Sequence, residues 1–121
     1  MWFCAHAIFY YRLDGQGSFL VHENVYLIAA DDADLALASA EELGRENEDL
    51  NVDGLIEVNG QPAQYIFAGI RKLIQVESSP EAAKGRLLSG TEATYSVMEV
   101  DTLEEVEALA RGEAMSVLYR E

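Results

Sequence analysis

The side chains with the clearest potential for metal binding or catalysis lie near the N-terminus. His6 and His22 are the only histidines of the 121-residue chain, and Cys4 is its only cysteine. If the two N-terminal strands form a β-hairpin whose turn centres near Asp14 and Gly15, the numbers of facing residues add up to about 28 to 30. His6 then lies opposite or diagonal to His22, with Cys4 on the same face. Two imidazoles and a thiolate are a ligand set for zinc or copper.

A metal site is the less favoured interpretation of the two histidines. A shift of the strand pairing by a single residue moves His22 to the other face of the sheet. Glu23, the nearest carboxylate, points away from His22 in an extended strand. The sequence also contains no Gly-x-Ser-x-Gly motif and no glycine-rich phosphate loop before a helix. We therefore predict two half-buried histidines among aromatic residues and no cofactor, with a small metal-dependent enzyme that uses His6 and His22 as a second alternative.

Two polar residues, Glu23 and Asn24, interrupt an otherwise apolar strand. A carboxylate inside a sheet usually has a charged partner, and Arg71 or Lys72 can supply it. This ion pair is the favoured interpretation, and a polar ligand-binding pocket is the alternative. Glu92, in a later strand, is a candidate for the lining of the same cleft. The candidate ligand- or partner-binding residues are therefore His6, His22, Glu23, Asn24, Arg71, Glu92 and Tyr95.

Acidic residues dominate the charge of the chain. There are 22 Asp and Glu residues against 8 Lys and Arg residues, which gives a net charge of -14 and a pI near 4.3. This balance argues against binding to nucleic acid and against docking on an anionic membrane surface. Residues 31–57 hold ten acids and one base, Arg45. Solvated helix faces are the favoured explanation, and an acidic inhibitor or immunity-type protein that binds a basic partner is the alternative.

The N-terminal segment does not have the features of a secretory signal or a membrane span. Residues 1–11 are apolar but too short for a helix that crosses a bilayer, and the first positive side chain, Arg12, follows them. A single cysteine fits a reducing compartment. We therefore expect a cytoplasmic protein. The length of 121 residues predicts one domain over residues 1–121, and half of its residues are apolar, enough for a compact core.

Six segments have the composition of β-strands. The first is apolar on both faces, so we expect it to be central and covered on both sides, or to contact another chain. Asn59-Gly60 is a hairpin signal between two later strands, and Gly69 inside a long strand suggests a β-bulge. The predicted strands cover residues 2–11, 18–30, 51–59, 63–77, 91–101 and 114–120, with one long loop at 78–90.

Two amphipathic helices are predicted from their N-terminal signals. The first begins after Asp31 and Asp32, which supply an N-cap and carboxylates near the positive helix end. The second begins at Thr102, where Glu105 completes a capping box, and it ends before Gly112. The resulting order is β-β-α-β-β-β-α-β. It predicts an α+β fold, a two-layer sandwich whose mainly antiparallel, curved sheet has roughly five or six strands.

The apolar surface of this sheet predicts self-association. The two helices are too short to cover both faces of the sheet, and a large exposed apolar patch marks an interface. A homodimer is the simplest solution, because it buries the same patch twice. The leading hypothesis is therefore a non-catalytic binding or interaction domain that forms a dimer. A sheet that curls into a partial barrel is the rival arrangement.

Four segments together resemble a known family. They are residues 2–13 (WFCAHAIFYYRL), 23–30 (ENVYLIAA), 67–73 (FAGIRKL) and 90–96 (GTEATYS). Their order and spacing resemble the bacterial DUF4288 family, a domain of unknown function. The resemblance spans residues 2 to about 100. It implies a small bacterial cytoplasmic domain and transfers no reaction and no catalytic residue. His22 stands where an aromatic residue is expected in this family.

Overall fold

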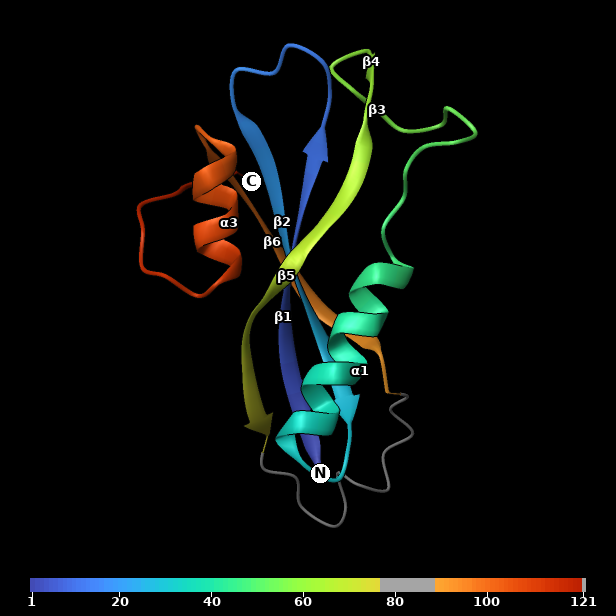
Figure 1. Ribbon diagram of the computed structural model, residues 1–121, viewed down its shortest axis with the longest axis vertical. Helices are drawn as coiled ribbons and strands as arrows, with labels where there is room; N and C mark the ends of the chain where they lie inside the picture. Colours follow the sequence, from blue (N-terminus) through green and yellow to red (C-terminus); the bar gives the residue numbers. More distant parts are fainter. Residues whose placement is uncertain (77–88, 121) are drawn as a thin grey trace.

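The chain folds around one curved antiparallel β-sheet that runs along the long axis of the molecule (Figure 1). The computed structural model describes residues 1–76 and 89–120. The sheet has the strand order β5-β1-β2-β6-β7, with β1 (Trp2–Arg12), β2 (Phe19–Ala29), β5 (Gln64–Val76), β6 (Thr91–Val100) and β7 (Leu118–Arg120). Together with two helices, this sheet confirms the predicted α+β class. Within the described residues, no helix is long and apolar enough to cross a membrane.

The β1–β2 hairpin closes through a loop and not through a tight turn. Phe9 pairs with His22, so the numbers of paired residues add up to 31. The predicted sum of about 28 to 30 is therefore wrong. The side chain of Gln16 spans the loop, because its Nε2 donates to the carbonyl oxygens of Tyr11 and Ser18 at 3.0 and 3.2 Å. A loop closed in this way shifts the register by one residue or more relative to a two-residue turn.

Helix α1 (Ala33–Glu46) begins where the sequence predicts it. The Asp32 carboxylate caps the helix by accepting from a backbone N–H of the first turn at 2.8 Å. A Cβ atom at Gly44 would overlap the ring of Phe67, so glycine lets the last turn approach β5 closely. The face of α1 that contacts the sheet belongs to a buried cluster of Phe3, Ala5, Ala7, Phe9, Tyr26, Ile28, Ala36 and Ala40.

Helix α3 (Leu103–Ala110) begins at the predicted capping residues. Thr102 Oγ1 accepts from the backbone N–H of Glu105 at 3.1 Å and donates to the Glu105 carboxylate at 3.2 Å. Gly112, with φ of 81°, follows the last turn as predicted. The buried face of α3 belongs to a second cluster of Ile8, Tyr10, Val21, Met98, Val100, Val106, Leu109 and Ala110.

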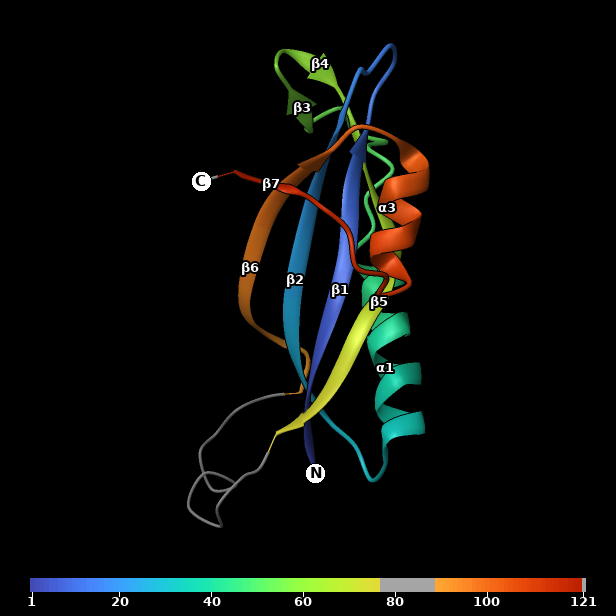
Figure 2. The same ribbon diagram turned by 90° about the vertical axis from the view of Figure 1, so that its left-hand side faces the viewer.

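The two helices lie on opposite faces of β1. Phe9 packs in the α1 cluster and its neighbour Ile8 packs in the α3 cluster, because successive side chains of a strand point to opposite faces. Strand β5 crosses between the helices in Figure 1, although both helices lie on the same side of the molecule in Figure 2. The strong twist of the sheet reconciles these views. The side chains on the two faces of β1 are therefore covered by different helices of the same chain.

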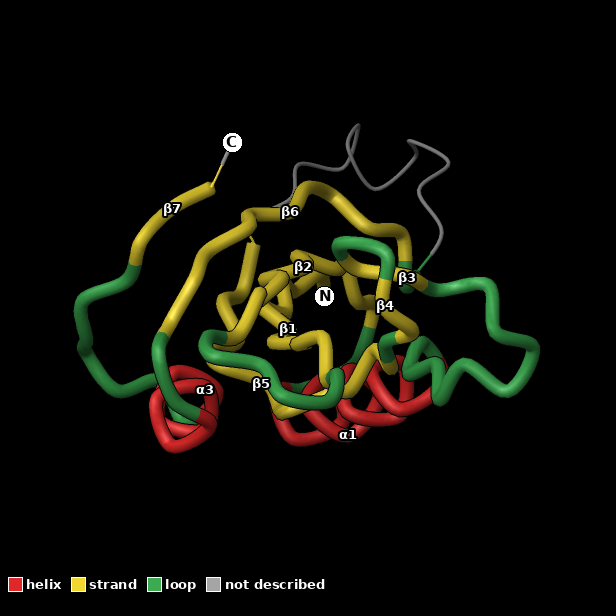
Figure 3. Tube along the Cα trace, turned by 90° about the horizontal axis from the view of Figure 1, so that it is seen from above, coloured by secondary structure: helices red, strands yellow, loops and turns green. Residues whose placement is uncertain are grey.

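Seen along its long axis, the sheet is bent into an arc (Figure 3). Strands β5, β1, β2 and β6 follow one another around this arc, and α1 and α3 lie near its β5 end. The curved sheet that the sequence predicts is therefore present, and β1 is an inner strand covered on both sides, the first of the two alternatives predicted for it.

Two predicted strands are shorter in the structure. Instead of a strand over 51–59, residues 49–56 form a loop, and only β3 (Glu57–Val58) pairs with β4 (Gln61–Pro62). Asn59 and Gly60 form the predicted turn between them, with φ of 52° and 79°. The predicted strand over 114–120 is reduced to β7. The predicted loop over 78–90 lies outside the described residues except for its last two positions.

The predicted irregularity at Gly69 is also present. Gly69 has φ of 152°, and the register between β1 and β5 shifts next to it. His6 pairs with Lys72, whereas the next residue of β1 pairs with Ile70. Arg71 is therefore an extra residue in β5, and this bulge re-aims its side chain.

Candidate functional site

The hairpin register places His6 and His22 on opposite faces of the sheet. His6 pairs with Val25, and His22 pairs with Phe9, an odd number of positions from His6 along β1. The predicted approach of the two imidazoles is therefore wrong, and they cannot share one metal ion. Across residues 1–76 and 89–120, no group of three or more His, Cys, Asp or Glu side chains is placed to hold a metal ion.

On the face of His6, Glu23 forms a partly buried ion pair with Arg71. The Nη1 atom of Arg71 donates to Glu23 Oε1 at 3.0 Å, and the two side chains are 30% and 13% exposed. The bulge in β5 makes this contact available, because Arg71 is the residue that the register shift adds. The predicted ion pair of Glu23 is present, and its partner is Arg71 and not the exposed Lys72.

His6 lies next to this ion pair without a hydrogen bond to it. Its Nδ1 atom is 3.7 Å from Glu23 Oε2 and has no hydrogen-bond partner among the described residues. Burial lowers the pKa of His6; the negative charge of Glu23 offsets part of this effect, and the positive charges of Lys72 and Arg71 add to it. Because the ordinary histidine pKa is already about 6.5, His6 is neutral at neutral pH.

A cavity of about 260 Å³ opens beside the Glu23–Arg71 pair. It lies between β2, β5, β6, α3 and the segment that leads from α3 to β7. The lining residues are Glu23, Arg71, Met98, Leu109, Glu113, Ala114, Met115, Val117 and Tyr119. The lining thus combines apolar side chains with the charged ones of Glu23, Arg71 and Glu113, and a cavity that joins apolar surface to convergent polar groups is a candidate small-molecule site.

On the opposite face, Asn24 is 7% exposed and belongs to a hydrogen-bonded cluster, here called the Asn24 cluster. Its Nδ2 atom donates to the hydroxyls of Tyr26 and Tyr65, each at 3.2 Å. The Nδ2 atom of Asn47, the C-cap residue of α1, donates to the Tyr26 hydroxyl at 3.2 Å. Burial raises the pKa of both tyrosines, so both hydroxyls keep their protons at neutral pH. The cluster thus joins β2, β5 and the end of α1.

His22 belongs to an aromatic group beside the Asn24 cluster. Its ring meets Tyr11 edge-on at a centroid distance of 5.3 Å and stacks on Tyr95 at 6.1 Å. Burial lowers the pKa of His22. Glu92 is exposed, and its negative charge raises the pKa of Tyr65. Glu92 pairs with Tyr26 of β2 and therefore lies on this face, so the prediction that it shares a cleft with Glu23 is wrong.

The seven predicted site residues thus divide into two groups. One group is His6, Glu23 and Arg71, and the other is His22, Asn24, Glu92 and Tyr95. Tyr26, Tyr65 and Asn47 were not among the residues predicted from the sequence. The pattern of β2 could have indicated Tyr26, which lies two positions after Asn24 on the same face of the strand. Tyr65 and Asn47 reach the cluster only through the packing of β5 and α1.

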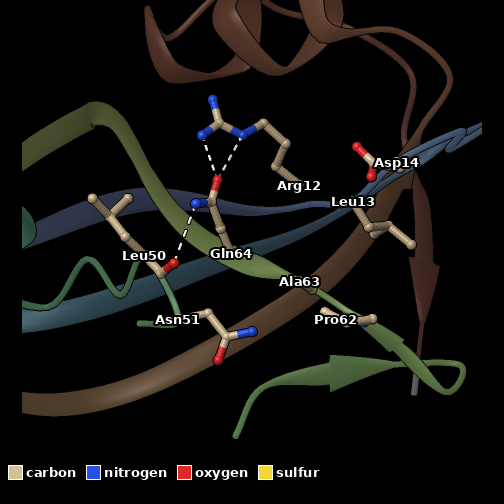
Figure 4. Close-up of a pocket in the computed structure, with 8 residues that line it drawn as sticks. All are labelled: Arg12, Leu13, Asp14, Leu50, Asn51, Pro62, Ala63 and Gln64. Atoms are coloured by element: carbon tan, nitrogen blue, oxygen red, sulfur yellow. Dashed lines mark hydrogen bonds between the residues drawn. The ribbon is translucent and has the colours of Figure 1, made fainter. Parts of the chain in front are cut away.

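A larger cleft of about 370 Å³ lies at the end of β1 (Figure 4). Gln64 connects Arg12 at the end of β1 with Leu50 in the loop that follows α1. Its Oε1 atom accepts from Nε of Arg12 at 3.0 Å and also from Nη2, and its Nε2 atom donates to the carbonyl oxygen of Leu50 at 3.1 Å. None of the residues that line the cleft is among the seven predicted site residues: Arg12, Leu13, Asp14, Leu50, Asn51, Pro62, Ala63 and Gln64.

Residues 49–56, beside this cleft, form a loop with a fixed backbone and exposed apolar side chains. Asp49 and Tyr65 exchange backbone hydrogen bonds at 2.7 and 2.9 Å. The Asn51 side chain binds the backbone N–H and carbonyl of Ile56 at 2.9 and 3.0 Å. Val52 is nevertheless 97% exposed and Leu55 is 81% exposed. The loop therefore presents apolar side chains to solvent from a well-supported frame.

Comparison with protein families matches residues 2–93 to the family described as Domain of unknown function (DUF4288). The chain belongs to this family. The DUF4288 match includes both histidines, the Glu23–Arg71 pair, the 49–56 loop and the Asn24 cluster, and it ends before Tyr95 and α3. Neither the curated proteins nor the solved structures yield a match to this DUF4288 chain.

Proposed function

We propose that this DUF4288 chain is a non-catalytic binding domain whose 49–56 loop contacts a basic protein. The observation that carries the proposal is the exposure of Val52 and Leu55, which lie almost entirely in solvent. Exposed apolar side chains gathered on one loop are typical of a surface that a partner covers. Leu50, half exposed, extends this surface to the cleft in Figure 4.

The backbone of the loop is fixed before any partner binds. Asn51 adopts a φ of 62° and is held by its two hydrogen bonds to Ile56. Ordering a loop on binding costs free energy, and a preformed loop avoids that cost. The support extends into the sheet, because Tyr65 pairs with Asp49 through its backbone and with Asn24 through its hydroxyl. Asn24 therefore acts in this proposal as a positioning residue.

The charges around the loop favour a basic partner. Carboxylates flank its exposed apolar side chains, at Glu48, Asp49, Asp53 and Glu57. Asp14 adds a further carboxylate at the adjacent cleft, which also holds a cation, the guanidinium of Arg12, hydrogen-bonded to Gln64. Negative potential attracts a positively charged surface, speeds its association and disfavours acidic proteins. The partner in this proposal has an apolar depression surrounded by Lys and Arg.

Site-specific photo-crosslinking tests this proposal. A photoreactive phenylalanine analogue replaces Val52 in one protein and Leu35, an exposed residue of α1, in a control. Both proteins are cross-linked in cells of the source organism, and the products are identified by mass spectrometry. We expect a discrete basic protein from position 52 that is absent from position 35.

The captured protein is then purified and its affinity for the unlabelled domain is measured. Val52→Asp together with Leu55→Asp should weaken binding by at least about tenfold, the effect of losing a buried apolar contact at an interface. Leu35→Asp should leave the affinity unchanged. Equal cross-linking from both positions, an acidic captured protein, or an unchanged affinity of the double variant would each contradict the proposal.

A second copy of the chain is the other candidate partner, because no described strand pairs with the outer edge of β5 beyond Phe67. The dimer predicted from the sequence used the apolar faces of the first hairpin, where the structure buries Phe3 and Phe9 within one chain. Among the described residues, β5 after Phe67 has backbone partners only in β1, and Ile74 is half exposed. An open strand edge is a template for pairing with another strand.

Light scattering tests this dimer. A dimer has twice the 13.4 kDa mass of one chain, and Ile74→Lys should return it to a single chain. Leu37→Lys on α1 is the matched control and should not change the mass. A mass of one chain that does not rise with concentration would exclude the dimer.

A further inference from the structure

We infer that the cavity beside Glu23 binds a small organic cation with an apolar body, such as an arylalkyl ammonium. This inference does not depend on the proposed role of the 49–56 loop, because the cavity lies on the other side of β2, among β6, α3 and the 111–117 segment. Its volume of about 260 Å³ suits a ligand of the size of a single aromatic ring with a short side chain.

The apolar side chains that line the cavity favour a ligand with an apolar body. Met98 and Leu109 are buried core residues, and Met115 and Val117 are half-buried residues that pack against the same cluster. Methionine side chains adapt their shape to different apolar surfaces and make favourable contacts with aromatic rings. An aromatic or branched aliphatic group therefore fits between these four side chains.

The carboxylate of Glu23 favours a ligand with a positive charge. Arg71 donates to Oε1, whereas Oε2 lies 3.7 Å from His6 Nδ1 and has no hydrogen bond among the described residues. Oε2 therefore keeps its capacity to accept from an ammonium group. A charge-assisted hydrogen bond of this kind is among the stronger ones in proteins.

An anionic ligand is disfavoured by the charge of the lining. Among the described residues, two carboxylates, those of Glu23 and Glu113, line the cavity with one guanidinium, that of Arg71. Arg71 already binds Glu23 through Nη1, so an anion that contacts the remaining guanidinium nitrogens also lies close to that carboxylate. A cation instead adds to Oε2 of Glu23 and leaves the Glu23–Arg71 contact in place. The net charge of -14 also attracts cations to the molecule.

The methionines provide a direct test, because two of the three, Met98 and Met115, line the cavity and Met1 does not. The protein is labelled at the methionine methyl groups and titrated with 2-phenylethylammonium, with 3-phenylpropionate as the anionic control of similar shape. We expect saturable shifts of the Met98 and Met115 methyl signals with the ammonium probe, an unchanged Met1 signal, and no saturation with the carboxylate probe.

Two variants complete the experiment. Glu23→Gln should weaken binding of 2-phenylethylammonium by at least about tenfold, whereas Glu104→Gln, an exposed control on α3, should not change it. Met115→Trp fills the cavity from the half-exposed 111–117 segment and should abolish the Met98 shift, even if Glu23→Gln disturbs the fold. Equal affinity for both probes, shifts that do not saturate, or shifts that persist in Met115→Trp would overturn the inference.

Discussion

The Glu23 carboxylate lies 3.0 Å from the Arg71 guanidinium although β2 and β5 are not neighbours in the sheet. Strand β1 runs between them, and the ion pair crosses over it beside His6. The contact depends on the bulge in β5, which turns Arg71 toward the same face as Glu23. One irregularity in an edge strand therefore connects three strands on the face that carries the cavity.

The first prediction concerns this ion pair. Arg71→Ala should lower the free energy of unfolding by about 2 kcal/mol, because it leaves the Glu23 carboxylate partly buried without a counter-ion; the value is below that of a fully buried pair since Arg71 is partly exposed. Urea denaturation measures the change. Lys72→Ala, the adjacent exposed cation, should alter stability by less than about 0.5 kcal/mol. Equal effects of the two substitutions would show that the contact contributes nothing.

The second prediction concerns pH. Burial lowers the pKa of His6 and of His22 in the folded chain. The unfolded chain therefore binds more protons below about pH 6.5, so the stability supplied by the neutral imidazoles is complete above that pH and is lost as the pH falls. Replacing either histidine by Gln should reduce the loss of stability between about pH 7 and pH 5.5. Carboxylate effects are common to wild type and variants and cancel in the comparison, and identical pH profiles would contradict the prediction.

The third prediction concerns the start of α3. Thr102→Ala removes the acceptor for the Glu105 backbone N–H and should destabilise the chain by about 1 kcal/mol. The total stability of a chain of this length is roughly 6 to 18 kcal/mol, so the fold should survive. Chemical denaturation with Ser116→Ala as a control measures the effect. An unchanged midpoint would mean that the helix does not need this cap.

The fourth prediction concerns salt. At a net charge of -14, repulsion between carboxylates opposes the folded state more than the few ion pairs of the described residues support it. Screening should therefore raise the melting temperature in about 0.3 M NaCl relative to about 0.01 M NaCl. Thermal denaturation monitored by circular dichroism provides the comparison. A melting temperature that falls with salt would show that attractive pairs such as Glu23–Arg71 dominate.

Features encoded by neighbouring residues were predictable from the sequence. The caps at Asp32 and Thr102 and the Asn59-Gly60 turn depend on side chains within a few positions of the backbone they affect. The register of the first hairpin depends instead on how Gln16 bridges its loop. No local pattern shows that bridge, and a displacement by one residue was enough to separate His6 from His22.

The predicted strands at 51–59 and 114–120 failed for different reasons. Asn51 and Gly54 have φ of 62° and 74°, which interrupts an extended chain and produces the loop. Met115 and Val117 alternate as in a strand, but they belong to an irregular segment that lies on the α3 cluster. The two apolar residues are half-buried on the α3 cluster, so the sequence alternates as in a strand although this segment pairs with no described strand. The Asn24 cluster could not be predicted from the sequence either, because Tyr65 and Asn47 join it only after the helix has packed on the sheet.

Helix α3 belongs to the folded core of this chain but lies outside the residues that the family match covers. The DUF4288 match ends at residue 93, yet Val106 and Leu109 cover Ile8 and Val21 on one face of the first hairpin. A fragment cut at the family boundary would keep this apolar face and lose its cover. A related chain that retains these core residues therefore needs a helix equivalent to α3 or another cover for this face, either from its own C-terminal extension or from a second polypeptide.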